Sequence, residues 1–427
     1  MVMGLYDRSK NQPRQAIALI SDYSDPALID QGDGCGQNVY VRQVGEALSQ
    51  LGWQVDMFTR KASPDDAPIV EHNPHCRTIR LVAGPEEFVH RDELMEHMPA
   101  FIQAFQKFQT KGGSHYPLIH TNYWLSGWAG LKLKQHSNVQ LIHTYHSFGV
   151  VKYETGSKPA CSDLRIQTER EVLENAHCVV ATSPQEERLM RSLISTKGRV
   201  QVIPGGADLD TFRAIPKGKA RKELGFEAQE KIVLYVGRFD PRGGLETLVR
   251  AFAQLSQAGT EPLKLLIVGD GDTTPEAIRE QQRIKAQVEQ LGITASVTFV
   301  GAVGHDILPL YYTAADICAI PSYDEPFGLV AIEAMACGTP VVASAVGGLR
   351  FTVLPEETGL LVEPQNVDEL ATAIERIFSD EVWSQKMRKQ ATERVQRNFS
   401  WAAAGAQLSD LYRRLLAQSL SGDLRVS

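Results

Sequence analysis

Residues 323–344 read YDEPFGLVAIEAMACGTPVVAS, and this stretch decides the fold class. It begins with a turn that contains Pro326 and Gly328, two residues that interrupt regular structure. The run of small apolar residues that follows is typical of a buried helix, and PVVAS at 340–344 is typical of a buried strand. A strand, ICAIP at 317–321, precedes the turn. This order of strand, turn, helix and strand is the unit from which parallel α/β sheets are built.

The same alternation extends along the chain, where short β-branched runs are separated by longer amphipathic ones. Expected strands in the first half lie at 16–20, 54–59, 78–82, 118–121, 140–144, 178–182 and 200–203. Expected strands in the second half lie at 232–237, 264–269, 297–301, 317–321, 340–344 and 359–363. Expected helices include 37–51, 245–258, 275–292 and 366–378. The pattern predicts an α/β protein with doubly wound parallel sheets.

The length of 427 residues is too great for one ordinary hydrophobic core. Residues 204–225 are rich in Gly, Pro and charge, and they separate two complete α/β series. We therefore predict an N-terminal domain over 1–205, a C-terminal domain over 206–398, and a final helix within 399–427 that packs back towards the N-terminal domain. Two such domains bind ligands in the cleft between the carboxyl ends of their strands.

Composition argues against several classes of function. The chain is 43% apolar and 22% charged with a formal net charge of -7, which does not suit a general nucleic-acid-binding protein. No apolar run is long enough for a membrane span, and the first residues contain no apolar signal core. The six cysteines are scattered without a C-x-x-C pair, so we expect neither a zinc site nor a disulfide framework and expect a cytoplasmic location.

The sequence also argues against a bound metal. Two D-x-D patterns lie at 208–210, in the expected linker, and at 270–272, in a glycine-rich turn, and we interpret both as turn chemistry. His120, His143 and His146 do not have the spacing of a zinc set on one helix, which favours core or sugar-contact roles. We therefore expect no cofactor.

A glycine-rich loop follows the first expected strand. Gly32, Gly34 and Gly36 lead into the helix expected from residue 37, and backbone amides at a helix start suit a phosphate. A plain strand-to-helix turn explains the loop equally well. The spacing is not G-x-G-x-x-G, and no acidic residue stands at the position that a dinucleotide requires. A nicotinamide-dependent oxidoreductase is therefore the weaker alternative.

A basic turn follows the strand expected at 232–237. Arg238 leaves the strand end and Arg242 follows before the next helix, so that an arginine fork can clamp a diphosphate. The alternative is a surface arginine paired with Asp240. The predicted position of this turn at the cleft favours the ligand role.

Two glutamates flank the turn of the opening stretch, Glu325 within it and Glu333 in the helix that follows. Carboxylates on either side of a helix start suit a ligand with a sugar at each end and phosphates between. The alternative is a helix-dipole effect plus a solvated glutamate. Two further phosphate-suited loops at the same expected cleft favour the ligand.

At this point the sequence resembles a known family. EPFGLVAIEAMACGTPVVAS is similar to the E-x7-E signature of retaining, nucleotide-sugar-dependent glycosyltransferases of the GT-B fold. The resemblance covers nearly the whole chain, through the glycine loop, HTNYWLSGWAG, HTYHSFG, VGRFDPRGG, VGDG and GLLV in that order. It implies two facing α/β domains that bind small-molecule substrates only, without a required metal.

The resemblance also implies roles for single residues. It assigns the nucleotide ribose to Glu333, the donor hexose to Glu325, and a contact near the reacting carbon to His146. The implied donor-binding set is Gly36, Arg238, Arg242, Phe327, Gly328, Leu329 and Glu333, and the implied catalytic set is His146, Arg238 and Glu325. A front-face, ion-pair-like reaction path is implied, in which the leaving diphosphate takes the acceptor proton and Arg238 stabilises its charge.

Two positions depart from the family pattern. The family usually carries a lysine where this chain has Gly243, and losing a cation near the leaving diphosphate can cost several kcal/mol of transition-state stabilisation. Arg242 stands one residue away and normally points elsewhere. Cys35 replaces a common glycine in the first loop, which is the milder change because cysteine is small.

The resemblance also implies an acceptor site in the N-terminal half of the chain. The positions that match acceptor-phosphate ligands are Gln37, Arg91, Tyr123, Ser147 and Arg165. For either arginine alone, a solvated helix charge is the commoner role. The sucrose-phosphate synthases carry GGQ in the first loop and the inositol-phosphate transferases carry GGMN, and this chain has CGQN. The resemblance therefore implies glucose transfer from UDP-glucose or another nucleoside diphosphate glucose to fructose 6-phosphate. Inositol phosphate as acceptor and a non-catalytic sugar-nucleotide-binding protein are the alternatives.

Overall fold

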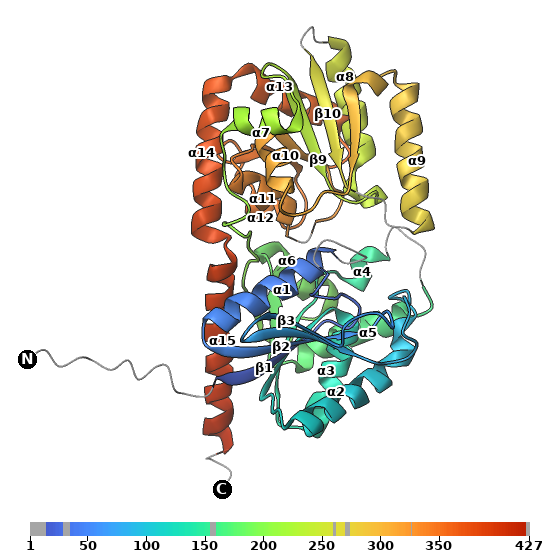
Figure 1. Ribbon diagram of the computed structural model, residues 1–427, viewed down its shortest axis with the longest axis vertical. Coiled ribbons are helices and arrows are strands. Elements are labelled where there is room, and N and C mark those ends of the chain that lie inside the picture. The colour runs from blue at the N-terminus through green and yellow to red at the C-terminus, as the bar shows by residue number, and fades with distance from the viewer. Residues whose placement is uncertain are drawn as a thin grey trace, which may run out of the picture.

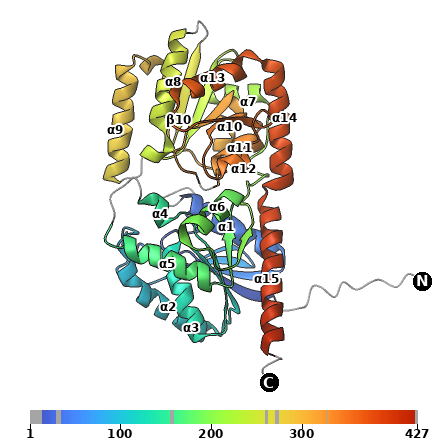
Figure 2. The same cartoon turned by 180° about the vertical axis from the view of Figure 1, so that it is seen from behind.

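The computed structural model describes residues 14–28, 35–153, 159–258, 262–269, 274–325 and 327–423. Two α/β domains lie one above the other, and the last two helices run along one side of both (Figures 1 and 2). The pattern of parallel strands with crossover helices confirms the predicted fold class. Gly32, Gly34 and residues 270–272, which the sequence singled out, lie outside the described residues.

The N-terminal domain is built on an eight-stranded sheet of order β3-β4-β2-β1-β5-β6-β7-β8. Its strands are β1 (Gln15–Ile20), β2 (Trp53–Arg60), β3 (Ile69–Asn73), β4 (Cys76–Leu81), β5 (Leu118–Asn122), β6 (Gln140–Thr144), β7 (Cys178–Ala181) and β8 (Val200–Val202). All neighbours pair parallel except β3, which pairs antiparallel with β4 at the sheet edge. The sequence did not predict β3, whose residues are only partly buried and carry little apolar signal.

Helices connect these strands in the N-terminal domain. They are α1 (Cys35–Gln50), η2 (Leu94–His97), α2 (Met98–Gly112), α3 (Trp124–His136), α4 (Gly149–Lys152), α5 (Ser162–Asn175), α6 (Pro184–Leu189) and η3 (Met190–Ile194). Capping residues fix where such a helix begins. In α6 the side chain of Ser183 accepts a hydrogen bond from the amide of Glu186 and caps the helix, and Pro184 is at the first helical position.

The C-terminal domain is a doubly wound parallel sheet of order β11-β10-β9-β12-β13-β14. Its strands are β9 (Lys231–Val236), β10 (Leu263–Val268), β11 (Val297–Gly301), β12 (Ile317–Ile320), β13 (Val341–Ser344) and β14 (Gly359–Val362). Its helices are α7 (Lys217–Leu224), η4 (Pro241–Gly243), α8 (Leu245–Ala258), α9 (Pro275–Gln290), η5 (Thr294–Ser296), α10 (Leu308–Ala314), α11 (Leu329–Ala336), α12 (Leu349–Thr352), α13 (Val367–Ser379) and α14 (Glu381–Asn398). The strand order reverses between β9 and β12, which is where such sheets bind ligands.

The last helix, α15 (Trp401–Asp423), belongs to the core of the N-terminal domain although it follows the C-terminal domain in the chain. Leu408 and Tyr412 are fully buried among apolar side chains of β1, β2 and α1. The indole Nε1 of Trp53 donates to Ser409 Oγ at 2.8 Å, and Tyr412 Oη lies 2.6 Å from His120 Nδ1. The chain therefore crosses between the domains twice.

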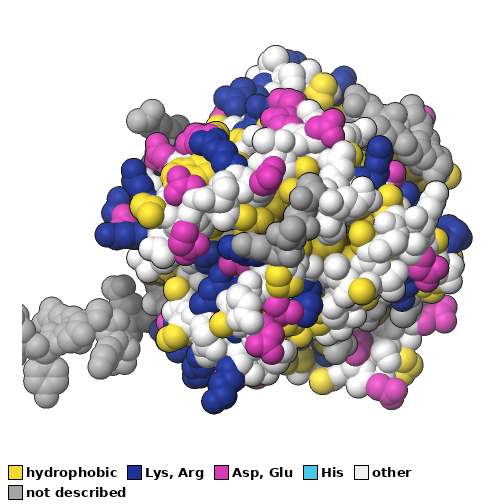
Figure 3. All heavy atoms as spheres, turned by 90° about the horizontal axis from the view of Figure 1, so that it is seen from above, with side chains coloured by type: hydrophobic (Ala, Val, Ile, Leu, Met, Phe, Trp, Pro, Cys, Tyr) yellow, Lys and Arg dark blue, Asp and Glu magenta, His cyan; other side chains and the backbone are white. Residues whose placement is uncertain are grey.

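The two domains meet through the carboxyl ends of their strands. An ideal Cβ on Gly36, in the first turn of α1, would lie 3.8 Å from Leu329 Cδ1, in the first turn of α11. Seen from above, the outer face of the C-terminal domain mixes basic and acidic side chains (Figure 3). Within the described part of the chain, no helix has both the length and the apolarity needed to cross a membrane.

We predict that Leu408→Ala lowers the free energy of unfolding by about 2–5 kcal/mol, because it removes a buried side chain that joins α15 to the N-terminal sheet. Urea unfolding followed by circular dichroism measures the change. Gln407→Ala on the exposed face of the same helix is the control and should change stability by less than about 0.5 kcal/mol. Equal effects in the two variants would show that α15 does not complete this core.

Candidate active site

Glu325 lies in the loop between β12 and α11, where its carboxylate is held by the start of the next helix. Its Oε1 accepts a hydrogen bond from the amide of Gly328 at 3.0 Å. Burial raises the pKa of Glu325 to about 6, while the amides of Gly328 and Phe327 act to lower it. In this structure the Gly328 amide, which the sequence assigned to the donor, is bound by Glu325 itself.

A glycine in the neighbouring loop fixes the Glu325 backbone. The amide of Gly348 donates to the Glu325 carbonyl oxygen at 2.7 Å. Gly347 has φ of 41°, and a Cβ there would lie only 2.1 Å from the same oxygen. Only glycine permits this approach, so the loop after β13 sets the position of Glu325.

Glu333 lies inside α11 and is 7% exposed. Its Oε2 accepts a hydrogen bond from the hydroxyl of Tyr312 at 2.9 Å. Burial raises the pKa of Glu333 to about 7, and nearby His305 acts to lower it. The solvated-glutamate interpretation therefore does not describe Glu333. Its contact with the ribose stays a prediction.

The basic turn after β9 holds its two arginines in different surroundings. Arg238 follows the strand and is exposed. Arg242 is paired with Asp240 through Nη2 to Oδ2 at 2.5 Å and Nε to Oδ1 at 3.1 Å, and this pairing holds the pKa of Arg242 above its ordinary value. Most of the charge of Arg242 is thus balanced within its own turn, which is the alternative considered from the sequence.

The position of Gly243 is closed by a neighbouring hydroxyl. A Cβ there would lie 2.5 Å from Tyr235 Oη, which donates to the carbonyl oxygen of Arg238 at 3.2 Å. A side chain at this position therefore requires Tyr235 to move. The hydroxyl of Tyr235 thus occupies the space that the side chain of the family lysine would need.

His146 follows β6 and has a backbone φ of 64°, which is rare for a residue that is not glycine. Its Nε2 lies 2.9 Å from Asn122 Oδ1, and the ring of Tyr40 packs edge-on at 4.9 Å. The side-chain amide of Asn122 donates to the carbonyl of Ile20, so its Oδ1 accepts from Nε2–H and the imidazole Nδ1 is left as an acceptor. Burial lowers the pKa of His146 to about 3, so the ring is neutral near pH 7.

Four residues of the predicted acceptor set form a connected group. Arg165 Nη1 donates to the Tyr123 hydroxyl at 3.1 Å, and Nη2 donates to both the carbonyl and the Oγ of Ser147 at 3.0 Å. The ring of Tyr23 packs on Tyr123 at 4.7 Å, and its hydroxyl donates to Gln37 Oε1 at 3.1 Å. Tyr123 has φ of 75°, so two of the four described non-glycine residues with positive φ belong to the predicted site.

Arg165 is completely buried, with 0% exposure, and its Nε donates to Glu169 Oε1 at 2.7 Å. Burial alone would lower the pKa of Arg165, but the surrounding groups, among them the Glu169 carboxylate and the Tyr123 hydroxyl, hold it above its ordinary value. Glu169 also accepts from the amide of Gly149. In this structure Arg165 positions Tyr123 and Ser147, and it is not a solvated helix charge.

Arg91, the fifth predicted acceptor residue, is half-buried and lies close enough to Tyr123 to influence its pKa. Arg91 also acts to lower the pKa of Arg242 in the other domain, so the two cations lie within electrostatic range of each other. Two neighbouring cations suit an anionic ligand. The ligand roles of all predicted residues stay predictions.

Sequence reasoning missed several polar residues at these strand ends. Asp22 lies two residues after the end of β1; its Oδ1 accepts from Ser126 Oγ, and its buried Oδ2 has no hydrogen-bond partner among the described residues. Glu186 of α6 faces Asp324 of the other domain across a small cavity. A position in the loop that follows a strand was the signal that could have identified Asp22 and Asp324. Within the described residues, no group of three or more His, Cys, Asp or Glu side chains could hold a metal ion.

Two α/β domains that face each other through their strand ends, with buried carboxylates beside a helix start, define a glycosyltransferase of the GT-B fold. A glycosyl transferase 4-like domain matches residues 35–206, and the glycosyl transferases group 1 family matches residues 216–397. The chain belongs to these glycosyltransferases. It is 36% identical to the D-inositol 3-phosphate glycosyltransferase of Corynebacterium efficiens, over 96% of this chain and 97% of that protein.

Solved structures agree with this assignment. The sucrose-phosphate synthase of Thermosynechococcus elongatus is 52% identical, with a TM-score of 0.88 over 95% of this chain and 100% of that one. The Anabaena protein HepE, solved with UDP and glucose, is 20% identical, with a TM-score of 0.73 over 94% of this chain and 100% of its own. At that identity the likeness to HepE concerns the fold alone.

We predict that Asp22→Asn stabilises the protein more at pH 8 than at pH 5. Burial raises the pKa of Asp22 from 3.8 to about 7, so folding disfavours the ionised carboxylate. Below pH 3.8 Asp22 is protonated in both states and its pKa shift does not change stability. As the pH rises towards 7 the unfolded chain ionises first, and wild-type stability falls. Asparagine resembles the protonated acid and does not titrate.

The stability difference between Asp22→Asn and wild type should grow by about 2–3 kcal/mol from pH 5 to pH 8. Urea unfolding at each pH measures it. Asp65→Asn, at an exposed position, provides the control for loss of one negative charge. A difference that does not change with pH would contradict the assignment of a protonated Asp22.

Proposed function

We propose that this glycosyltransferase moves glucose from UDP-glucose to fructose 6-phosphate, with retention at the anomeric carbon, to give sucrose 6-phosphate. The observation that carries the proposal is the match to the Thermosynechococcus elongatus sucrose-phosphate synthase, at 52% identity over 95% of this chain. Gln37 supports it, because the resemblance associates GGQ with this acceptor. The cytoplasmic location and the independence from metal expected from the sequence stay predictions.

The donor would lie across the strand ends of the C-terminal domain. The buried carboxylates of Glu325 and Glu333 are acceptors suited to sugar and ribose hydroxyls, and their burial makes each hydrogen bond stronger than in water. Arg238 is the exposed cation beside them, and it would lie against the diphosphate. Arg242 contributes less, since Asp240 balances its charge.

The acceptor would lie on the N-terminal domain, between Gln37 and the group held by Arg165. Arg91 is the cation that would reach the phosphate of the acceptor. Arg165 would act mainly by orienting Tyr123 and Ser147, because its own guanidinium is buried. Domain closure would then bring the acceptor hydroxyl to the donor carbon.

The reaction follows from these positions. The bond between the anomeric carbon and the diphosphate oxygen breaks, and the acceptor hydroxyl attacks from the same face as its proton passes to the leaving diphosphate. Arg238 would stabilise the negative charge that grows on the diphosphate. His146 is neutral and offers Nδ1 as an acceptor, so it would bind a donor hydroxyl rather than supply a proton.

A product assay tests the proposal directly. The protein is incubated with UDP-glucose and either fructose 6-phosphate or D-inositol 3-phosphate, and the products are identified by mass and by the configuration at the new linkage. We expect sucrose 6-phosphate. A product made only with inositol phosphate would replace the proposed acceptor and leave the glycosyltransferase assignment intact.

The inositol phosphate acceptor is the second candidate. The 36% identity to the Corynebacterium efficiens enzyme over 96% of this chain favours it, whereas Asn38, which the resemblance finds in both groups, favours neither. In this structure Asn38 Nδ2 donates to the carbonyl of Leu28 at 2.8 Å, so it fixes the loop before the glycine-rich stretch. A role in fixing the loop does not distinguish the two acceptors.

We predict that Arg238→Ala lowers kcat with fructose 6-phosphate by about a hundredfold to a thousandfold, as expected for loss of one group that stabilises transition-state charge. Glu333→Gln should raise the Kd for UDP by about tenfold, because one charge-assisted hydrogen bond is lost. Steady-state kinetics and calorimetry measure the two effects. Arg250→Ala, at an exposed position of α8, is the control. Wild-type turnover in Arg238→Ala would overturn the mechanism.

A non-catalytic sugar-nucleotide-binding protein is a further candidate, favoured by Gly243 and by the Arg242–Asp240 pair.

We predict that Gly243→Lys combined with Tyr235→Phe raises kcat over Tyr235→Phe alone by at least tenfold, because the double change supplies the cation and the space for it. Binding of UDP-glucose without turnover in wild type, with turnover in the double variant, would identify a binding protein. If kcat does not rise in the double variant, Arg238 stabilises the leaving diphosphate sufficiently without a cation at position 243.

A further inference from the structure

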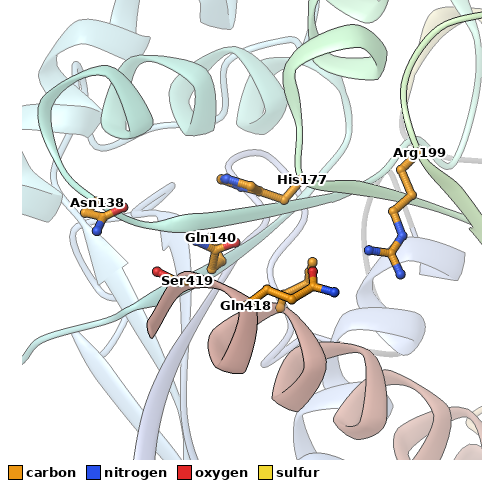
Figure 4. A pocket seen from close by; sticks show the side chains of 7 residues that line it. Asn138, Gln140, His177, Arg199, Gln418 and Ser419 are labelled. Atoms are coloured by element: carbon orange, nitrogen blue, oxygen red, sulfur yellow. The ribbon is translucent and has the colours of Figure 1, made fainter. Parts of the chain in front are cut away.

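A cavity of about 340 Å³ lies in the N-terminal domain, away from the cleft. It is formed where β6, β7 and β8 begin, whereas the candidate active site lies where the strands end. The last turns of α15 close it from below (Figure 4). Its lining residues are Asn138, Gln140, His177, Arg199, Leu415, Gln418 and Ser419. The cavity is therefore separate from both predicted substrate sites.

The cavity is open to the surface, and its described lining residues include several hydrogen-bond donors and no carboxylate. The backbone amide of Leu141 donates to His177 Nδ1 at 2.8 Å, so the proton of the neutral ring is on Nε2. Burial and the charge of Lys134 lower the pKa of His177 to about 4, which keeps the ring neutral near pH 7. The imidazole therefore presents one N–H donor.

Arg199 provides the positive charge. It is exposed, and within the described residues no hydrogen bond or ion pair holds its guanidinium. Arg414 of α15 lies near enough for both arginines to act on the pKa of Cys178. In Figure 4 the side chain of Arg199 extends from the start of β8 towards Gln418 of α15. A cation beside neutral donors, without a competing carboxylate, suits an anion.

The lining also selects the kind of anion. Among the described lining residues only Leu415 has an apolar side chain, so the cavity is mostly polar. The amides of Asn138, Gln140 and Gln418 and the hydroxyl of Ser419 suit hydroxyl groups. A volume of about 340 Å³ is at the lower end of the range for small-molecule sites.

We propose that this cavity is a second anion site, which binds the phosphate group of a small phosphorylated polyol through Arg199. The hydroxyl groups of the ligand would contact the Nε2–H of His177 and the side-chain amides. The inference does not rest on the proposed reaction, because the site shares no residue with the predicted donor and acceptor sites.

The position of the cavity gives its ligand a physical connection to the cleft. Leu415 and Gln418 lie on the helix that also carries Trp401, whose ring packs against Tyr40 at 5.7 Å. Tyr40 in turn packs against His146 at 4.9 Å. A ligand that changes how the end of α15 packs therefore acts on an element that extends to the predicted catalytic histidine.

The test uses the full chain labelled with ¹³C at leucine methyl groups, with the Leu415 signal identified by its loss in Leu415→Met. Inorganic phosphate and glycerol 3-phosphate are titrated separately, because they distinguish free phosphate from phosphate on a polyol. We expect a saturable shift of the Leu415 signal with a lower Kd for glycerol 3-phosphate. Arg199→Gln should raise that Kd at least tenfold, and Arg250→Gln should leave it unchanged.

Two further variants keep the test decisive. Asn138→Asp, at an exposed position, should also raise the Kd, because it places a negative charge at the cavity. Arg91→Ala removes a predicted ligand of the acceptor phosphate and should leave the Leu415 titration unchanged. If Leu415 does not respond, or responds equally in wild type and Arg199→Gln, the proposal is wrong. Loss of the response in Arg91→Ala alone would show that phosphate binds only at the acceptor site.

Discussion

The donor side of the cleft depends on close contacts between backbone segments at the strand ends of the C-terminal domain. Gly347 lies against the carbonyl oxygen of Glu325, and a Cβ on Gly244 would lie 1.9 Å from the carbonyl oxygen of Pro321. The first contact fixes the loop of Glu325, and the second joins the arginine turn to the strand that precedes that loop. The amide of Tyr323 strengthens this junction by donating to the Arg242 carbonyl at 2.7 Å. Side chains can be arranged for chemistry here because the backbone beneath them has little freedom.

The site combines groups whose charges are set by burial. Glu325 and Glu333 have raised pKa values of about 6 and about 7, and His146 has a lowered pKa of about 3. Glu333 is buried and Glu325 is partly buried, so a hydroxyl-rich ligand would meet acceptors that are partly shielded from bulk water. The lysine that the family usually carries is absent at Gly243, where the hydroxyl of Tyr235 leaves no space for a side chain.

The sequence predicted the parts of the structure that local patterns determine. Strand positions and the division into two domains follow from apolar periodicity and from turn residues, so the strand expected at 232–237 is observed as β9 (Lys231–Val236). The pairing of Arg242 with Asp240 is local too, and it was one of two interpretations considered. Contacts between distant segments could not be predicted, because spacing along the chain carries no signal for them. Arg165 with Tyr123 and Ser147 is one case, and the partly polar edge strand β3 is another.

The crossing of α15 into the N-terminal domain has a consequence for synthesis on the ribosome. The apolar layer that covers β1, β2 and α1 includes Leu408 and Tyr412 of α15, which are translated after the whole C-terminal domain. The first half of the chain therefore emerges without one wall of its own core, whereas the second half contains its full set of strands once α14 has emerged. The N-terminal sheet therefore reaches its final packing only after α15 has left the exit tunnel, later than the C-terminal domain that lies between them in the chain.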